Sequence, residues 1–407
     1  MNAVFTEAMK QTHTILLPQM LEYHFPILQA ALTVGGYKTK VLSVSGREAR
    51  EWGKKYVHND MCFPAVNIIG QMIAVLKNGE YDADSVAFLI PQAGGSCRAT
   101  GYYYILQKAL AAAGYEQVPI ISLNLSGVNN QPGFSITLSM IVAAVAAVCA
   151  GDLLMHLYQQ VRPYEKEFGK CDELLAKWQQ WFCNQIAVGK LKNRAVLRKA
   201  YKEVIKDFSA VPRQAIPKTK VGIVGELYIK YCSLGNFNAE QFLLEHGCEI
   251  RTTGFAVYAL YVLQGDTVDD KSSTASKFLT GLLLKYLQKV YGDVCEAVAS
   301  SGCFAVMPQY SDFAKWANCF ISDKCVTGDG WLISAEAAVL IEQGYDRVIA
   351  FNPFGCLVSH INSKGVAAGL RRYYPQAKIT NIDCDADGSE ILLQSRMLMG
   401  IGSKLKN

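Results

Sequence analysis

The sequence predicts an α/β protein with two open, parallel sheets joined by a helical region. Short apolar runs rich in β-branched residues alternate with helix-like stretches in the first third of the chain, and the same alternation returns in the last third. Strands separated by helices are typical of βαβ units, which build parallel sheets. A chain of 407 residues is longer than one ordinary core requires, so two α/β domains are expected.

The first predicted α/β domain covers residues 1–135. Its expected strands are residues 14–17, 39–44, 85–91 and 118–124. Its expected helices are residues 20–33, 63–77 and 102–113, with Gly114 as the cap that ends the third helix.

Residues 136–216 form the predicted helical region, for connection and dimerisation, because they show no strand pattern. An apolar stretch, 134–149, overlaps the start of this region. It contains Ser135 and Ser139, and Gly151 and Asp152 follow it. It is shorter than the ~20 apolar residues that span a membrane, so we expect a core or subunit-interface helix and no membrane contact.

The second predicted α/β domain covers residues 217–407. Its expected strands are residues 221–224, 248–252, 347–352 and 377–383. A long helical stretch is expected at 256–298, with further helices at 242–245, 335–343, 366–373 and from 389 onward.

The composition limits the function classes. Apolar residues make up 51% of the chain and charged residues 18%, which favours filled cores over disorder. The net charge is +5 and no block of five or six like charges occurs, so no nucleic-acid partner is expected. The N-terminus lacks the pattern of a secretory signal, and a cytoplasmic location is therefore expected.

Thirteen cysteines are the most unusual feature of this composition. In a reducing compartment they indicate metal binding or redox chemistry more than disulfides. Free cysteine is also a common core residue. That role is expected for seven of them: Cys149, Cys171, Cys183, Cys232, Cys248, Cys295 and Cys384.

Four other cysteines precede predicted helices, in loops where α/β sheets place their sites: Cys62, Cys97, Cys325 and Cys356. Gly94 and Gly95 permit a tight turn before Cys97, and Gly355 immediately precedes Cys356. A helix start stabilises a thiolate, and Arg98 adds a positive charge beside Cys97.

Two histidines are candidate catalytic residues. His360 follows Cys356 by one helical turn and would be a proton donor, and His58 precedes Cys62. A lone histidine is more often structural. The sequence contains no C-x-x-C pair, no phosphate-binding G-x-x-x-x-G-K-[ST] loop and no G-x-G-x-x-G motif. ATP hydrolysis and dinucleotide binding by this chain are therefore not expected.

These loops resemble the cysteine-rich module of the 2-hydroxyacyl-CoA dehydratase and activase group, and within it the double-cubane cluster proteins. The resemblance runs from about residue 12 to residue 400 and is carried by KKYVHNDMCFPAVNIIGQ, LIPQAGGSCRATGYYYILQKAL, PIISLNLSG, GDGWLISAEAAVLIEQG and PFGCLVSHINSKG. The chain differs from the expected pattern at Val358, where proline is usual, and at Asp329, where glutamate is usual.

The resemblance implies two Rossmann-like domains with an iron–sulfur cluster in the cleft between them, in a homodimer. A dehydratase subunit holds one four-iron (4Fe-4S) cubane through three cysteines, and a double-cubane protein holds two bridged cubanes through six. Electrons come from a separate ATP-hydrolysing iron–sulfur activase. By position, Cys62, Cys97 and Cys356 match the strongest motifs, and Cys325 matches a cysteine of part of the group. Cys303 and Cys319 complete a set of six because they lie near Cys325 in the sequence.

The expected function is a double-cubane oxidoreductase that reduces a small molecule with electrons from the activase. The cysteines of the second domain favour this over a single-cubane, dehydratase-like lyase subunit. A non-catalytic electron carrier and a plain α/β protein with structural cysteines are further alternatives.

Overall fold

The structure is a computed structural model that describes residues 3–93, 96–123, 131–268 and 273–402. Gly94, Gly95 and the last residue of the predicted strand 118–124 lie outside the described residues.

Two four-stranded parallel sheets confirm the predicted fold class. The first has the order β2-β1-β3-β4 and the second the order β6-β5-β7-β8. The strands are β1 (Thr14–Leu17), β2 (Lys38–Val41), β3 (Val86–Pro91), β4 (Ile120–Leu123), β5 (Thr219–Gly225), β6 (Cys248–Thr252), β7 (Arg347–Pro353) and β8 (Lys378–Cys384).

The central strands are almost continuously apolar because helices cover both faces of each sheet. In β3, every residue from Val86 to Ile90 is buried, and β5 is buried from Val221 to Gly225. The central strands of each sheet therefore lie inside the molecule, whereas the edge strand β2 has no fully buried residue.

The helices of the first α/β part cover the first sheet. They are α1 (Met9–Thr12), α2 (Phe25–Thr33), α3 (Gly46–Tyr56), α4 (Phe63–Lys77) and α5 (Tyr102–Ala113), with the 3₁₀ turns η1 (Ala83–Ser85) and η2 (Arg98–Gly101). Helices α4 and α5 have the predicted bounds.

Helix α2 begins five residues later than predicted, with Pro26 in its first turn, where the missing N–H costs nothing. Helix α3 is an element that the sequence analysis missed because most of its residues are polar. The sequence feature that marks the start of this helix is the capping box of Ser45 and Glu48.

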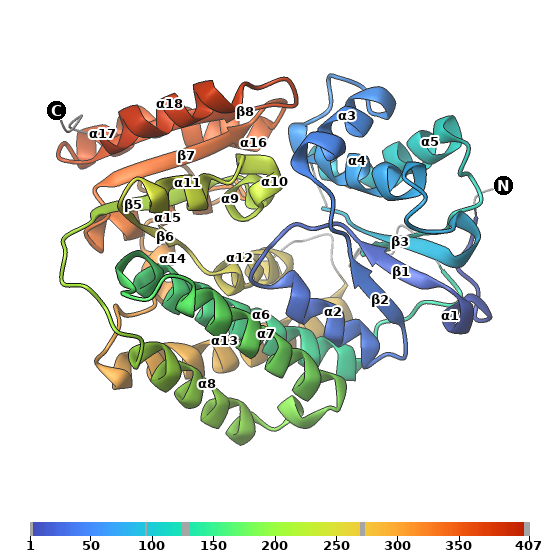
Figure 1. The fold of residues 1–407 in the computed structure, drawn as a ribbon, viewed down its shortest axis with the longest axis horizontal. Helices are drawn as coiled ribbons and strands as arrows, with labels where there is room; N and C mark the ends of the chain where they lie inside the picture. Colours follow the sequence, from blue (N-terminus) through green and yellow to red (C-terminus); the bar gives the residue numbers. More distant parts are fainter. Residues whose placement is uncertain (1–2, 94–95, 124–130, 269–272, 403–407) are drawn as a thin grey trace.

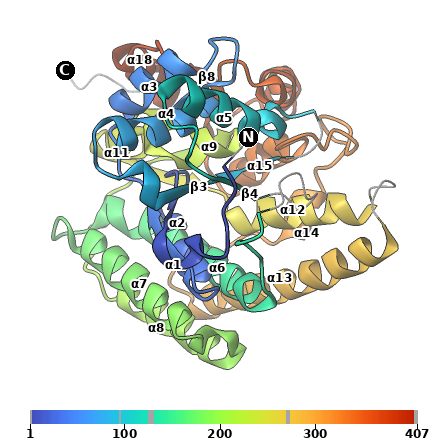
Figure 2. The same ribbon diagram turned by 90° about the vertical axis from the view of Figure 1, so that its right-hand side faces the viewer.

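The helical region lies below the sheets in Figure 1 and contains α6 (Leu138–Val161), α7 (Lys170–Ala187) and α8 (Arg194–Ser209), with the turns η3 (Arg162–Tyr164) and η4 (Lys190–Lys192). Two further helices, α12 (Phe255–Val268) and α13 (Thr274–Ser301), belong to this region, although they lie between β6 and β7 along the chain. Figure 2 shows α12 and α13 side by side on one flank. Arg194 and Arg198 of α8 hydrogen-bond Asp293 of α13, which links these two helices.

Helix α6 is long and apolar enough to cross a membrane by length and composition alone. In the structure, 72% of its most apolar window is buried, as in the core helix of a soluble protein. The prediction of a buried helix is therefore supported. Ile136 and Leu138, at the start of the helical region, are exposed.

The remaining helices surround the second sheet. They are α9 (Leu227–Tyr231), α10 (Ser233–Asn236), α11 (Ala239–Glu245), α14 (Tyr310–Ala314), α15 (Leu332–Glu342), α16 (Leu357–Ser359), the π-helical turn η5 (His360–Lys364), α17 (Ala367–Tyr373) and α18 (Glu390–Ile401).

Both sheets share one strand order, in which the first strand of each lies between the second and the third. In such sheets, ligands bind beyond the carboxyl ends of the two strands where the order reverses. Here these are β1 and β3 in the first sheet, and β5 and β7 in the second. The loops after β3, β5 and β7 carry Cys97, Glu226 and Cys356.

Candidate functional site

Four helices begin at the candidate site, each with an acidic side chain or a thiol at its N-cap. Cys62 caps α4, Cys97 caps η2, which leads into α5, Glu226 caps α9, and Cys356 caps α16. The Glu226 carboxylate accepts a 3.1 Å hydrogen bond from the backbone N–H of Ile229. The N–H of Ser359 donates to the Cys356 sulfur at 3.5 Å. Free N–H groups at helix starts favour negative charge on these side chains.

The loops that carry Cys62 and Cys356 touch each other across the two sheets. The N–H of Phe63 donates a 2.9 Å hydrogen bond to the carbonyl oxygen of Phe354. Gly355 has a φ of +72°, and a Cβ atom placed on it would lie only 3.1 Å from the Cα of Cys62. Glycine is therefore required here by both its backbone conformation and the close approach.

Cys97, at the start of η2, belongs to the same site as Cys62 and Cys356. The Arg98 guanidinium hydrogen-bonds the carbonyl oxygen of Asp60, and it also lies within 3.3 Å of a Cβ position on Gly355. The Cys62 and Cys97 thiols interact electrostatically with each other and with Glu226. The structure thus brings Cys62, Cys97 and Cys356 into one site.

Two carboxyl groups share the site with these thiols. Asp329 is buried, and it interacts electrostatically with Cys97, Cys356 and Glu226. Burial raises the pKa of Glu226 to about 7. Burial, and then the nearby Glu226, raise the pKa of Asp329 to about 8. Both groups therefore exchange protons near neutral pH.

The surroundings of the thiols oppose the stabilised thiolate expected at Cys97. Burial raises the pKa of Cys97 to about 11 and that of Cys356 to about 12, and Glu226 adds to both shifts. Burial also raises the pKa of Cys62, against the effect of a hydrogen bond with Tyr102. Desolvation and neighbouring acids thus outweigh the helix starts and Arg98.

Lys230 is a buried cation that interacts electrostatically with both of these acids. Its ammonium group contacts both carboxylate oxygens of Glu336 at 2.7 and 3.0 Å, and both side chains are 1% exposed. Lys230 lowers the pKa of Glu226 and of Asp329, but burial outweighs it in both cases. Lys230 is thus shared between Glu336, which it contacts directly, and the two acids of the site.

Several hydroxyl groups surround the thiols. The Tyr102 hydroxyl lies 3.0 Å from the Cys62 sulfur. The hydroxyl of Ser359 interacts with the Cys356 thiol. The hydroxyl of Tyr261 is buried and makes no hydrogen bond with another described residue. Buried polar atoms of this kind call for a partner such as a water molecule or a bound group.

Cys325 lies next to this site. It belongs to the loop that supplies Asp329, and its carbonyl oxygen accepts a 2.9 Å hydrogen bond from the N–H of Trp331. It also interacts electrostatically with Tyr261, which in turn is close to Asp329. Cys325 is therefore a neighbour of the three-cysteine group.

Cys303 and Cys319 are exposed and lie in other surroundings. The Cys303 thiol contacts the carbonyl oxygen of Ser301, and the Cys319 thiol contacts that of Lys315. Within the described part of the chain, neither is in contact with Cys62, Cys97 or Cys356. Six of the seven predicted core cysteines are buried and Cys183 is half-buried.

The two candidate histidines lie at the surface. His58 is 73% exposed, with its ring 3.5 Å from Asp60. His360 is exposed in η5, where its N–H donates to the carbonyl oxygen of Cys356. Partial burial and then Lys364 lower the pKa of His360. Both belong to the loops that carry cysteines, without a described contact to the thiols.

Three of the donors at this site are cysteine thiols, the side chains that hold iron–sulfur clusters in proteins. Across the described ranges, no group of three or more histidine, cysteine, aspartate or glutamate side chains converges closely enough to hold one ion. Cubane clusters are held by thiolates at separate corners, with a wider span than a single ion. A bound cationic cluster would also displace the thiol protons that burial now retains.

Glu226 and Asp329 were not predicted as site residues. A signal for Glu226 was present, because it directly follows Gly225 at the end of β5, much as Cys356 directly follows Gly355 after β7. Asp329 was noted only as a departure from a family pattern, and its burial is a property of the folded chain.

Comparison of the chain with protein-family models and with curated proteins found no match.

Proposed function

We propose that this chain is an iron–sulfur protein in which Cys62, Cys97 and Cys356 hold one four-iron cluster, as in a subunit of a 2-hydroxyacyl-CoA dehydratase. The observation that supports this most is the meeting of three loop cysteines from both sheets in one site with two buried carboxyl groups. The cluster, when bound, supplies one-electron chemistry at low potential.

This proposal prefers the single-cubane alternative to the double cubane that the sequence favoured. The preference rests on Cys303 and Cys319, whose thiols contact the carbonyl oxygens of Ser301 and Lys315. Three thiolates would leave one corner of a cubane without a protein ligand.

The residues of the chain would bury the reacting groups and carry protons. Loss of a hydroxyl group from a 2-hydroxyacyl substrate requires a proton, and Glu226 and Asp329 have pKa values near neutrality. Amide groups at the helix starts and the Tyr102 hydroxyl would donate hydrogen bonds to sulfur.

A redox partner fits the surface beside Cys356. Phe354 and Leu357, on either side of Gly355-Cys356, are each 53% exposed. Exposed apolar side chains beside a redox site support docking of an electron donor, which we propose to be a separate ATP-hydrolysing activase. We also propose that the chain forms a homodimer and is located in the cytoplasm.

A double-cubane reductase remains the second candidate because Cys325 lies in the same loop as Asp329. The two candidates differ in iron content and in the cysteines required. Iron and acid-labile sulfide per chain, measured on anaerobically purified protein with EPR after reduction, separate them.

The sharpest version of this measurement compares two cysteine variants. Cys97→Ala should lose the cluster, whereas Cys319→Ala, a matched change at an exposed cysteine, should keep it. Unchanged iron in Cys97→Ala would overturn the assignment of ligands. Twice the iron of one cubane, with losses in Cys303→Ala and Cys319→Ala, would favour the double cubane.

A further inference from the structure

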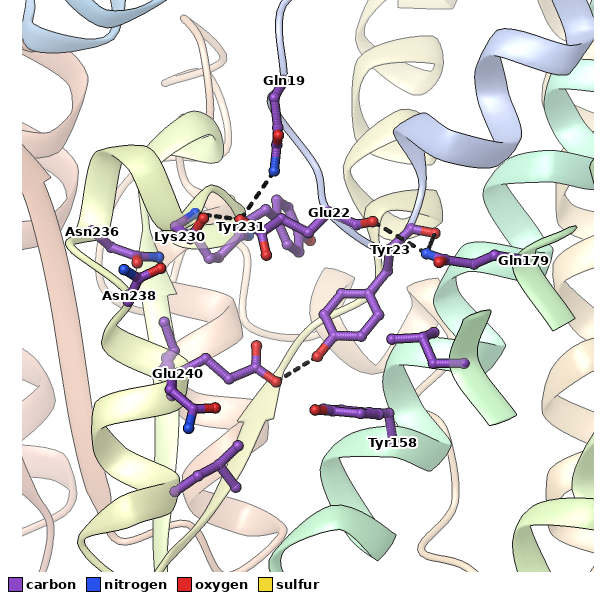
Figure 3. A pocket seen from close by; sticks show the side chains of 15 residues that line it. Gln19, Glu22, Tyr23, Tyr158, Gln179, Lys230, Tyr231, Asn236, Asn238 and Glu240 are labelled. Carbon is purple, nitrogen blue, oxygen red and sulfur yellow. Dashed lines mark hydrogen bonds between the residues drawn. The ribbon is translucent and has the colours of Figure 1, made fainter. Parts of the chain in front are cut away.

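A cavity of about 360 Å³ lies between the first sheet, the helical region and the second sheet. This volume falls within the range of small-molecule sites. The loop after β1, helices α6 and α7, and the α9–α11 segment all contribute to its wall (Figure 3). The lining residues that decide its chemistry are Glu22, Tyr23, Tyr158, Lys230, Tyr231 and Glu240.

The charged side chains of this cavity leave an excess of negative charge. Glu22 and Glu240 both line it, and Lys230 is the one cationic side chain among its described lining residues. The Lys230 ammonium is bound to both carboxylate oxygens of Glu336. It is therefore already neutralised and does not balance the two cavity carboxyls.

Glu240 is held in place and points into this space. Its Oε1 accepts a 2.5 Å hydrogen bond from the Tyr23 hydroxyl, an arrangement visible in Figure 3. Its Oε2 lies 3.5 Å from the side-chain nitrogen of Gln159. Both contacts are with neutral donors, so neither cancels the charge of an ionised Glu240.

Glu22 is held from the opposite side. Its Oε1 accepts hydrogen bonds from the backbone N–H of Ser233 at 3.0 Å and from the Gln19 side chain at 3.3 Å. Glu22 also interacts electrostatically with Glu240. Two fixed carboxyls that repel each other across a cavity are relieved by a cation placed between them.

Aromatic rings complete the surroundings of the two carboxyls. The rings of Tyr23 and Tyr158 meet edge to face with their centroids 5.6 Å apart, and Tyr231 lines the same cavity. Tyrosine faces attract organic cations, whereas carboxylates supply the hydrogen-bond acceptors for an ammonium group.

We propose that this cavity binds a small organic cation whose ammonium group lies between Glu240 and Glu22, with its carbon skeleton against Tyr23 and Tyr158. A bare metal ion is disfavoured because the described residues contain no cluster of three metal-ligating side chains. The volume also exceeds the needs of one ion.

This site is separate from the cysteine site and does not depend on its cluster. The two share helix α9, because Glu226 caps the helix at the cysteine site and Lys230 and Tyr231 line the cavity. No cysteine lines the cavity among its described residues. Binding can therefore be tested on the protein whether or not iron is present.

The test is isothermal titration of the full chain with n-butylammonium, with n-butanol as the neutral probe of equal length. We expect butylammonium to bind and butanol to bind at least about tenfold more weakly, since it lacks the charge. Glu240→Gln should weaken butylammonium binding about tenfold or more. Glu245→Gln, on the exposed face of the same helix, should leave it unchanged.

Equal binding of butanol and butylammonium would overturn the proposal, as would undiminished binding to Glu240→Gln. Preferential binding of Ca²⁺ over butylammonium would also contradict it. Should Glu240→Gln fail to fold by circular dichroism, Glu22→Gln provides the same test from the other carboxyl.

Discussion

The backbone N–H of Phe63 donates a 2.9 Å hydrogen bond to the carbonyl oxygen of Phe354, and this bond joins the two cysteine loops. Phe63 opens α4 directly after Cys62, and Phe354 stands two residues before Cys356. The first residue belongs to the first sheet's half of the molecule and the second to the other half. The spacing of these two thiols is therefore set by the docking of the halves.

Gly355→Ala should destabilise this junction. The added Cβ would lie 3.1 Å from both the Cys62 Cα and the Met61 carbonyl oxygen, at a φ of +72°. We expect a loss of about 2–4 kcal/mol in the free energy of unfolding, measured by urea denaturation. Gly247→Ala is the matched control, because Gly247 has a φ of +75° and open space around it. An equal loss in both variants would show that the close approach contributes nothing.

Tyr102→Phe should preserve the proposed cluster and change its potential. The hydroxyl lies 3.0 Å from the Cys62 sulfur, and hydrogen bonds to sulfur raise the potential of an iron–sulfur centre. We expect wild-type iron content with a more negative reduction potential in an EPR-monitored titration. Tyr104→Phe is the control, because Tyr104 is exposed on the same helix. An unchanged potential in Tyr102→Phe would remove this contact from the tuning of the cluster.

Glu240→Gln should flatten the pH dependence of stability. Burial, with Glu22 adding to it, raises the pKa of Glu240 to about 7 from 4.5, whereas Tyr23 and Gln159 act in the opposite direction. The folded state thus binds the proton more tightly, and its stabilising effect is lost as the pH rises from about 4.5 through 7.

For the wild type without added amine, this predicts a loss of about 1–3 kcal/mol between pH 5 and pH 8 that Glu240→Gln lacks. Urea denaturation at both pH values measures it, and Glu245→Gln serves as the control on the same helix. The same pH slope in Glu240→Gln as in the wild type would contradict the prediction.

Asp152→Ala should be strongly destabilising. Asp152 accepts hydrogen bonds from the N–H groups of Phe255 and Ala256 at 2.6 and 2.9 Å, and from His24 at 2.7 Å. Both Asp152 and His24 are fully buried. We expect a loss of about 3–5 kcal/mol in urea denaturation, because the start of α12 would keep unpaired donors.

The control for this change is Asp387→Ala, which removes an exposed ion pair with Lys54. That variant should lose less than about 1 kcal/mol. Similar losses in both variants would show that the buried network of Asp152 is weaker than its contacts suggest.

The local pattern of the chain was sufficient to predict most of the fold. Strand β6 and helices α4 and α5 have the predicted bounds, because each is an apolar run with clear ends. Helix α3 was missed because most of its residues are polar, although its apolar and polar residues lie on opposite faces. Its capping box would have revealed it.

The candidate site was predictable only in part. That Cys62, Cys97 and Cys356 precede helices follows from the alternation of strands and helices, which is a local property. The grouping of Cys303 and Cys319 with them rested on proximity in the sequence, and in the structure the two thiols contact the carbonyl oxygens of Ser301 and Lys315.

The sequence by itself determined the two α/β halves and the position of cysteines at helix starts, because these depend on neighbours along the chain. Only the tertiary structure decided which thiols meet and that Glu226 and Asp329 accompany them. It also places the Cys97 thiol among buried groups, which raise its pKa to about 11. The physical reason is that desolvation and charge interactions act through space between segments far apart in the sequence.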